Sequence, residues 1–222
     1  MIKHVVVAID GPAAAGKSTV AKIVAKKLGY TYIDTGAMYR AFTWYTMHKG
    51  VDPQNEQESI KLIPEVNIVL YPDGRVFCNE FDVTKEIRTT RVSGNVSYIA
   101  SYKDIRLALV ELQRKMAENT SVIMDGRDIG TYVLPNADVK IFQIATAETR
   151  AQRRYKENIE KNIECTYEDI VADVQKRDRI DSGRAFAPLK PAQDSIELDT
   201  SNMNIDEVVD AIVDIINKKV GK

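Results

Sequence analysis

Residues 9–19 read Ile9-Asp10-Gly11-Pro12-Ala13-Ala14-Ala15-Gly16-Lys17-Ser18-Thr19. The apolar run 5–9 precedes them, and a helical pattern follows. In this strand–loop–helix context, Gly11 and Gly16 allow a tight backbone path that turns N–H groups toward phosphate oxygens. Lys17 adds a mobile cation, and the Ser18 hydroxyl can ligate Mg²⁺. The run therefore predicts a loop that binds the phosphates of a nucleoside triphosphate, in preference to a glycine-rich turn without a ligand.

The composition limits the classes to which the chain can belong. At 222 residues, one α/β domain with inserted regions is favoured over two independent domains. The net charge is −1 with 28% charged residues, so the chain lacks the bulk cationic field that non-specific nucleic-acid binding needs. We therefore expect no nucleic-acid partner.

The cysteines and histidines indicate neither a disulfide framework nor a zinc site. Cys78 and Cys165 lie far apart, outside any metal-ligand spacing, and His4 and His48 are isolated. We interpret the cysteines as free thiols of a reducing compartment. Residues 1–10 lack the pattern of a signal peptide, and no apolar run approaches the ~18 residues that span a bilayer. We expect a cytoplasmic monomer without a membrane partner.

The rest of the chain alternates between strand and helix patterns. Residues 19–28 have helical apolar spacing closed by Gly29, and residues 30–33 read as a short strand. The apolar runs 121–125, 139–144 and 195–199 are typical of further strands in a parallel sheet. Residues 205–216 place six apolar side chains on one helical face, which predicts core packing.

One segment interrupts this alternation. Residues 66–70 alternate between apolar and polar, a Pro72-Asp73-Gly74 turn follows, and residues 75–78 are mainly apolar. This pattern predicts an antiparallel hairpin with a third short strand around 82–84. Because the segment from about 64 to 91 carries its own apolar alternation and is not of low complexity, we interpret it as an inserted sub-region.

Arginines beside acidic residues form the second informative feature. They occur in 34–40 and 125–128, which follow strands, and in 177–184, which follows a helix. Ligands of open parallel sheets bind at the carboxyl ends of strands, so these clusters can converge on one crevice. A surface ion pair is the commoner explanation for any single arginine, but three clusters beside one phosphate loop favour a shared site.

Phosphoryl transfer explains why such arginines would be useful. The charge of the transition state is spread over phosphoryl oxygens, so catalysis depends mainly on alignment and electrostatic stabilisation. Bidentate guanidinium groups suit that task. The sequence shows no evident catalytic histidine or nucleophilic triad, which fits an acceptor that is already an anion and needs no general base.

At these residues the chain resembles the short bacterial cytidylate kinases, within the phosphate-loop nucleoside monophosphate kinases. The motifs that carry the resemblance follow in chain order: GPAAAGKST (11–19), DTGAMYR (34–40), IRLALVELQR (105–114), DGRDIGT (125–131), VKIF (139–142) with AETRAQRR (147–154), and RDRIDSGRAFAPLKPA (177–192). The inserted hairpin also looks like the enlarged monophosphate-binding region of that family. The likeness runs from residue 5 to about 195.

The resemblance implies a role for each matching position. Lys17 would bridge the ATP phosphates and Ser18 would ligate Mg²⁺. The whole loop would hold the phosphates, through Gly11, Pro12, Ala13, Ala14, Ala15, Gly16, Lys17, Ser18 and Thr19. Arg40, Arg127 and Arg177 would grip the acceptor phosphate with Arg184 nearby, and Asp181 would bond the ribose hydroxyls. Ser97, Arg106 and Asp128 would read the cytosine edge, and Thr35 and Tyr39 would shape the same pocket. The catalytic group would comprise Lys17, Arg127 and the lid arginines Arg153 and Arg154.

We therefore expect an α/β phosphate-loop kinase with a five-stranded parallel sheet flanked by helices. Its core would comprise about 1–35, 104–146 and 166–222, the monophosphate-binding insert about 36–103, and a short lid about 147–165. The expected reaction is Mg²⁺-dependent transfer from ATP to CMP or dCMP. UMP, another nucleotide or a small metabolite such as shikimate are alternative acceptors. A GTPase is disfavoured because residues 217–220 fail the guanine-reading motif at Val220, and a nucleotide sensor would bind ATP without monophosphate-dependent turnover.

Overall fold

The computed structural model describes residues 4–160 and 163–221, which form two compact units. The first unit contains the chain up to residue 32 and from residue 119 onward, and the second contains residues 33–118. The helix at 103–116 therefore belongs to the second unit in this division. The expected limits of the insert and of the lid stay predictions.

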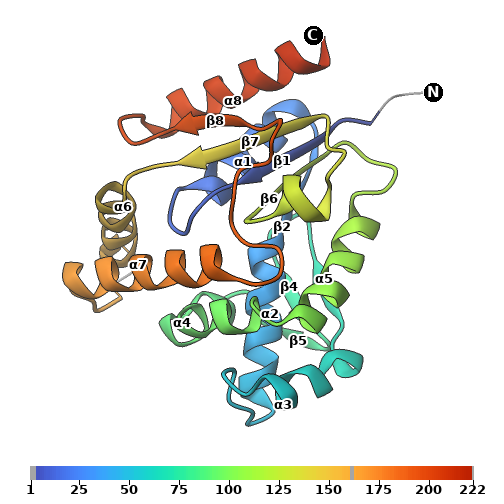
Figure 1. Ribbon diagram of the computed structural model, residues 1–222, viewed down its shortest axis with the longest axis vertical. Helices are drawn as coiled ribbons and strands as arrows, with labels where there is room; N and C mark the ends of the chain where they lie inside the picture. Colours follow the sequence, from blue (N-terminus) through green and yellow to red (C-terminus); the bar gives the residue numbers. More distant parts are fainter. Residues whose placement is uncertain (1–3, 161–162, 222) are drawn as a thin grey trace. The chain divides into compact units, whose positions relative to one another are not determined.

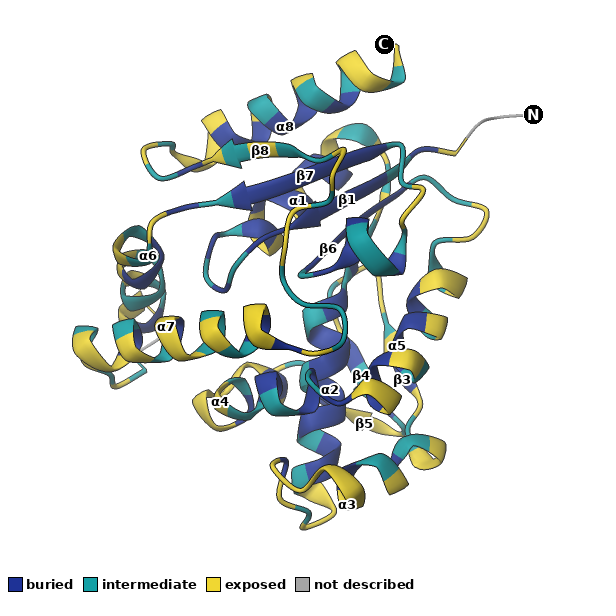
Figure 2. Cartoon of the chain, in the orientation of Figure 1, coloured by how far each residue is buried: buried dark blue, intermediate teal, exposed yellow. Residues whose placement is uncertain are grey.

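A five-stranded sheet organises the first unit (Figure 1). Its order is β2 (Thr31–Asp34), β6 (Val122–Gly126), β1 (Val6–Asp10), β7 (Val139–Ile144) and β8 (Ile196–Asp199). The pairs β1–β6, β1–β7 and β7–β8 are parallel. The three central strands are buried along almost their whole length, as Figure 2 shows, which explains their nearly continuous apolar sequences.

Helices α1 (Lys17–Leu28) and α8 (Ile205–Val220) pack against this sheet through one apolar cluster with β1 and β7. Five of the six apolar residues expected on one face of α8 are buried, among them Val208, Ile212 and Ile216, so the core-packing prediction is confirmed for them. It is wrong for Ile205, which lies in the first turn of the helix and is 54% exposed. Gly29 ends α1 in the left-handed conformation, and a capping box of Asn204 and Glu207 begins α8. The unit also contains α6 (Ala147–Glu160), α7 (Tyr167–Gly183) and a π-helical turn at Ile129–Val133.

The second unit contains the expected antiparallel insert. Strands β3 (Ile68–Leu70), β4 (Val76–Cys78) and β5 (Phe81–Asp82) form a sheet in that order. Gly74 takes a φ of 93° in the turn between β3 and β4, a conformation that glycine adopts without strain. The hairpin prediction is therefore confirmed, and the third strand lies slightly earlier than 82–84.

Helices α2 (Thr35–His48), α4 (Thr90–Ile99) and α5 (Lys103–Met116) build the core of the second unit around the buried side chains of Met38 and Phe42. The unit also has a short helix α3 (Glu56–Lys61) and two 3₁₀ turns, Ile63–Glu65 and Glu86–Arg88. Across residues 4–160 and 163–221, no helix combines the length and apolar composition needed to cross a membrane.

Candidate active site

The phosphate loop occupies residues 11–16, between β1 and α1. A Cβ atom at Gly11 would lie 2.0 Å from the carbonyl oxygen of Gln143, so only glycine fits beside β7. Gly16 begins α1 with a φ of 87°, and within the described residues no side chain caps this helix end. The first N–H groups of α1 are therefore available to an anion, which the positive end of the helix favours.

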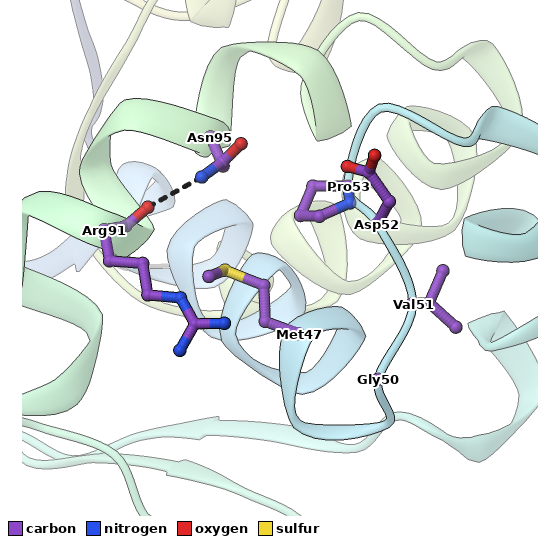
Figure 3. A pocket seen from close by; sticks show the side chains of 7 residues that line it. All are labelled: Met47, Gly50, Val51, Asp52, Pro53, Arg91 and Asn95. Carbon is purple, nitrogen blue, oxygen red and sulfur yellow. Dashed lines mark hydrogen bonds between the residues drawn. The ribbon is translucent and has the colours of Figure 1, made fainter.

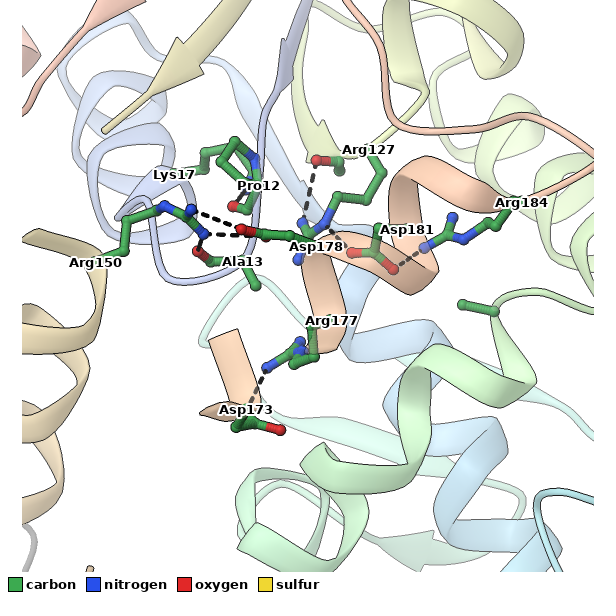
Figure 4. A network of polar contacts seen from close by, with 12 residues as sticks. Pro12, Ala13, Lys17, Arg127, Arg150, Asp173, Arg177, Asp178, Asp181 and Arg184 are labelled. Atoms are coloured by element: carbon green, nitrogen blue, oxygen red, sulfur yellow. Dashed lines mark hydrogen bonds and ion pairs between the residues drawn. The ribbon is translucent and has the colours of Figure 1, made fainter. Parts of the chain in front are cut away.

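Three carbonyl groups of the loop accept hydrogen bonds from side chains. Lys17 Nζ donates to the Pro12 oxygen (2.7 Å), Arg150 Nη1 to the Ala13 oxygen (3.0 Å) and Gln143 Nε2 to the Ala15 oxygen (2.6 Å) (Figure 4 for the first two). In a planar trans peptide, a carbonyl held on one side directs the adjoining N–H to the opposite side. These contacts therefore favour a loop whose N–H groups form an anion cradle.

Lys17 is a buried cation beside other charges. Burial and the nearby Arg127 guanidinium lower the pKa of Lys17 well below its ordinary value, whereas Asp125, Asp10 and Asp181 oppose this change. An added anion would therefore reduce the repulsion between Lys17 and Arg127. This arrangement suits the binding of phosphate groups.

Ser18 and Asp125 form the part of the site best suited to a cation. Ser18 Oγ donates to Asp125 Oδ2 (2.8 Å), and Tyr32 Oη donates to Asp125 Oδ1 (2.8 Å). A hydroxyl with a carboxylate is the oxygen set by which phosphate-loop enzymes hold Mg²⁺. Within residues 4–160 and 163–221, no group of three or more His, Cys, Asp or Glu side chains is arranged to hold a metal ion. The Ser18 hydroxyl and the Asp125 carboxylate are the oxygens that would hold a cation here.

Ser18 was predicted from the sequence as a cation ligand, whereas Asp125 was not. Its signal was present, because Asp125 follows three apolar residues of a buried strand and directly precedes the Gly126-Arg127-Asp128 run. What the sequence lacked was the strand order, which places β6 beside β1 and so brings Asp125 to the phosphate loop.

The buried carboxylate of Asp181 contacts two of the predicted arginines of the first unit (Figure 4). Arg127 Nε donates to Asp181 Oδ2 (2.8 Å), and Arg184 Nη2 donates to Asp181 Oδ1. Burial alone would raise the pKa of Asp181, but the guanidinium groups of Arg127, Arg184 and Arg177 outweigh burial and hold that pKa at about 2. Arg184 is itself buried, and its Nε and Nη1 atoms have no hydrogen-bond partner. The cluster therefore retains unused donors for an anionic ligand.

Asp10 holds the segment that carries Asp128. The Asp10 carboxylate accepts the N–H groups of Ile129 (2.8 Å) and Gly130 (2.7 Å), at the start of the π-helical turn. Desolvation raises the pKa of Asp10 to about 7. Asp128 itself is buried directly before this turn. Asp10, the last residue of β1, thus anchors the segment that follows the Arg127-Asp128 pair. The sequence alone did not indicate this contact.

The arginines of α6 make contacts of three kinds. Arg150 is bidentate with Asp178 of α7 (3.0 and 2.6 Å). Arg153 donates to the carbonyl of Thr200 (2.6 Å) and, at 3.3 Å, to that of Ala15. Arg154 pairs with Glu157 on its own helix at 3.2 Å. The phosphate-binding roles expected of Arg153 and Arg154 stay predictions.

The remaining candidate residues belong to the second unit. Asp34 caps α2 by accepting from the Ala37 N–H and also pairs with Arg40 at 3.1 Å. The buried Arg106 guanidinium lies 5.3 Å from the centre of the Tyr39 ring and donates to the Ala100 carbonyl (2.9 Å). Thr35 and Ser97 are also buried, on α2 and α4. The structure therefore brings Tyr39 and Arg106 together.

A cavity of about 360 Å³ also lies in the second unit, beside α2 and α4 (Figure 3). It is lined by Met47, Gly50, Val51, Asp52, Pro53, Arg91 and Asn95. None of these residues carries the sequence motifs. The chemical groups described above therefore define the candidate site, and this cavity does not.

Comparisons with known proteins decide the family. The family model described as "Cytidylate kinase" matches residues 7–218. The chain belongs to the cytidylate kinase family. It is 49% identical to the cytidylate kinase of Bacillus licheniformis, with all of both chains covered. It is 50% identical to that of Clostridioides difficile, with 96% of this chain and 99% of the relative covered.

Membership of the cytidylate kinase family confirms the resemblance carried by the motifs. A solved gluconokinase from Sinorhizobium meliloti 1021 matches with a TM-score of 0.54 at 11% identity, over 96% of this chain and 92% of that chain. This second likeness shows a shared fold alone. The expected α/β kinase fold is confirmed by the sheet order and by this neighbour.

Proposed function

We propose that this enzyme transfers the γ-phosphoryl group of ATP to CMP or dCMP, giving ADP and CDP or dCDP. The observation that carries the proposal is the proximity, within the first unit, of Lys17 to the arginines around Asp181. Lys17 of the phosphate loop lies close enough to Arg127 for the guanidinium to lower its pKa, and Arg127 belongs to the cluster around Asp181. Lys17 suits the donor phosphates, and the arginines suit an acceptor phosphate.

The donor would bind through the loop that comprises residues 11–19. Its N–H groups and Lys17 would hold the β- and γ-phosphates, where negative charge develops during transfer. Ser18 and Asp125 would hold Mg²⁺, and the ion would neutralise phosphate charge when bound. The Ser18–Asp125 hydrogen bond supports this assignment because both oxygens already face one another.

The acceptor phosphate would bind to Arg127, Arg177, Arg184 and Arg40. Arg127 uses Nε and Nη1 for Asp181 and for the Gly126 carbonyl, so its remaining donors are the ones we assign to phosphate. An oxygen of the CMP phosphate forms the new bond to Pγ, while the bond from Pγ to the bridging oxygen of ADP breaks and ADP keeps that electron pair. Since the attacking oxygen is already an anion, no side chain has to accept a proton.

We assign recognition of the nucleoside to the remaining predicted residues. Asp181 would accept from the ribose hydroxyls, and Asp128, Arg106 and Ser97 would pair with the cytosine edge. Cytosine offers an amino donor beside acceptors, which one carboxylate and one guanidinium complement. Thr35 and Tyr39 would complete the pocket, and the contact of Tyr39 with Arg106 supports their shared role. Arg153 and Arg154 would close over the phosphates and exclude water.

A panel of acceptors tests the proposal. The purified chain is mixed with ATP, Mg²⁺ and CMP, dCMP, UMP, AMP, GMP or shikimate, and ADP release is measured. We expect CMP and dCMP to give the highest kcat/KM. A higher kcat/KM for any other acceptor, or ATP binding without acceptor-dependent turnover, would overturn the proposal.

We further propose that the enzyme is a monomer that acts in the cytoplasm, in keeping with the free thiols of Cys78 and Cys165.

A further inference from the structure

Gln143 contacts the phosphate loop with both its main chain and its side chain. Its carbonyl oxygen occupies the place that a side chain at Gly11 would need, 2.0 Å from the Cβ position. Its Nε2 donates to the Ala15 carbonyl at 2.6 Å. The side chain is buried, and its neighbours Phe142 and Ile144 in β7 are apolar. A buried amide in this strand therefore departs from the apolar pattern at the point where the strand touches the loop.

Core stability alone does not explain why a glutamine occupies this buried position. The Oε1 atom of Gln143 is buried and has no hydrogen-bond partner. A polar atom removed from water without a partner costs free energy, so an apolar side chain of similar size would serve the core at least as well. The contact with Ala15 is the feature that an apolar residue would lose.

The Ala15 carbonyl accepts a second hydrogen bond, which is longer than that from Gln143 and comes from a different element. Arg153 Nη1 lies 3.3 Å from this oxygen and comes from α6. We expect Arg153 to turn toward the phosphates when both substrates bind, which would end its contact with Ala15. Gln143 belongs to a central strand and stays in place, so it can support the loop throughout the cycle.

We propose that Gln143 is a positioning residue for the donor phosphates. Its amide holds the Ala15 carbonyl away from the nucleotide, and the planar peptide that joins Ala15 to Gly16 then directs the Gly16 N–H toward the phosphates. The inference rests on the proposed function in one respect, namely that residues 11–19 bind the phosphates of ATP. It does not depend on which acceptor the enzyme uses.

Two variants and one control test this role through the dissociation constant of Mg·ADP, measured by calorimetry. Gln143→Met keeps the length of the side chain and removes the donor. Gln143→Glu has a donor only when its carboxyl is protonated, and burial raises the pKa of such a group. Gln57→Glu introduces the same change at an exposed position of α3 and is the matched control.

We expect Gln143→Met to weaken Mg·ADP binding about tenfold at every pH, the usual effect of losing one buried hydrogen bond. Gln143→Glu should bind weakly at pH 8 and recover, relative to the wild type, as the pH falls toward 6, because the protonated carboxyl again donates to Ala15. Gln57→Glu should follow the wild type at all pH values. Melting temperatures recorded alongside show whether each variant is folded.

Unchanged Mg·ADP affinity in Gln143→Met would overturn the inference, and so would a Gln143→Glu variant whose affinity relative to the wild type does not depend on pH. If Gln143→Glu fails to fold, Gln143→Met still decides the question. Failure of the proposed function gives a different result, because the wild-type chain itself would then not bind Mg·ADP or not phosphorylate CMP.

Discussion

Replacing Asp181 with asparagine tests whether this carboxylate compensates the buried arginines. In the folded chain the pKa of Asp181 falls from the ordinary 3.8 to about 2, even though the side chain is buried. One pKa unit corresponds to about 1.4 kcal/mol, so the ionised form contributes about 2.5 kcal/mol to folding at neutral pH. We therefore expect Asp181→Asn to lower the free energy of unfolding at pH 7 by about 2–3 kcal/mol.

The pH dependence gives the prediction its sign. A group whose pKa is lowered by folding stabilises the protein above its unfolded value and loses this effect as the pH falls through the folded value. The difference between wild type and Asp181→Asn should therefore be constant above about pH 5 and shrink between about pH 4 and pH 2. Urea unfolding followed by circular dichroism at each pH measures it. Any other acid-sensitive group acts in both proteins and cancels in the difference.

The matched control is Asp173→Asn, which removes a carboxylate that is half exposed and lies 3.9 Å from Arg177. Because such pairs contribute little, we expect a change below about 1 kcal/mol. Inorganic phosphate should also raise the melting temperature of Asp181→Asn more than that of the wild type, since an anion can replace the lost charge. A difference between wild type and Asp181→Asn that stays the same from pH 7 to pH 2 would refute the reasoning.

Three further predictions concern the site. Lys17→Ala should lower kcat about 10²-fold or more, as loss of one preorganised charge typically does, and an effect confined to the KM for ATP would contradict its assigned role. Asp125→Asn should raise the Mg²⁺ concentration needed for half-maximal rate about tenfold or more and weaken Mn²⁺ binding in the presence of ADP, measured by electron paramagnetic resonance. Asp128→Asn should reduce the preference for CMP over UMP, measured as the ratio of their kcat/KM values, by the equivalent of about 1–3 kcal/mol. Equal losses of kcat/KM for both acceptors would assign Asp128 a structural role instead.

Local signals in the sequence were sufficient for much of the fold. The phosphate loop, the end of α1 at Gly29 and the β3–β4 turn each depend on glycine at a position where the backbone takes a positive φ or approaches another strand. The apolar face of α8 follows from spacing within one helix. Such features need only neighbouring residues. The strand–loop–helix order, the helix end, the turn and the apolar face are confirmed, and phosphate binding by the loop stays a prediction.

The arginine cluster of the first unit was predictable to different degrees. Arg177 and Asp181 lie four residues apart near the end of α7, so helical geometry alone brings them to one side, and Arg184 directly follows the helix. Arg127 reaches Asp181 across 54 positions of sequence. Its place depended on the fold and on the rule that ligands meet the carboxyl ends of parallel strands.

The residues that the sequence analysis missed share a physical cause. Asp10, Asp125 and Gln143 each occupy a strand otherwise composed mainly of apolar residues, and each uses its side chain on a loop or helix from elsewhere in the chain. In the sequence, such a residue is visible only as a polar exception in an apolar strand. The sequence does not show which group forms a hydrogen bond with it. A buried polar side chain needs a hydrogen bond, so each exception in a central strand implies some partner at that end of the sheet. The strand order then identifies the partner, because the polar ends of β1, β6 and β7 lie next to one another, beside the loop at residues 11–16.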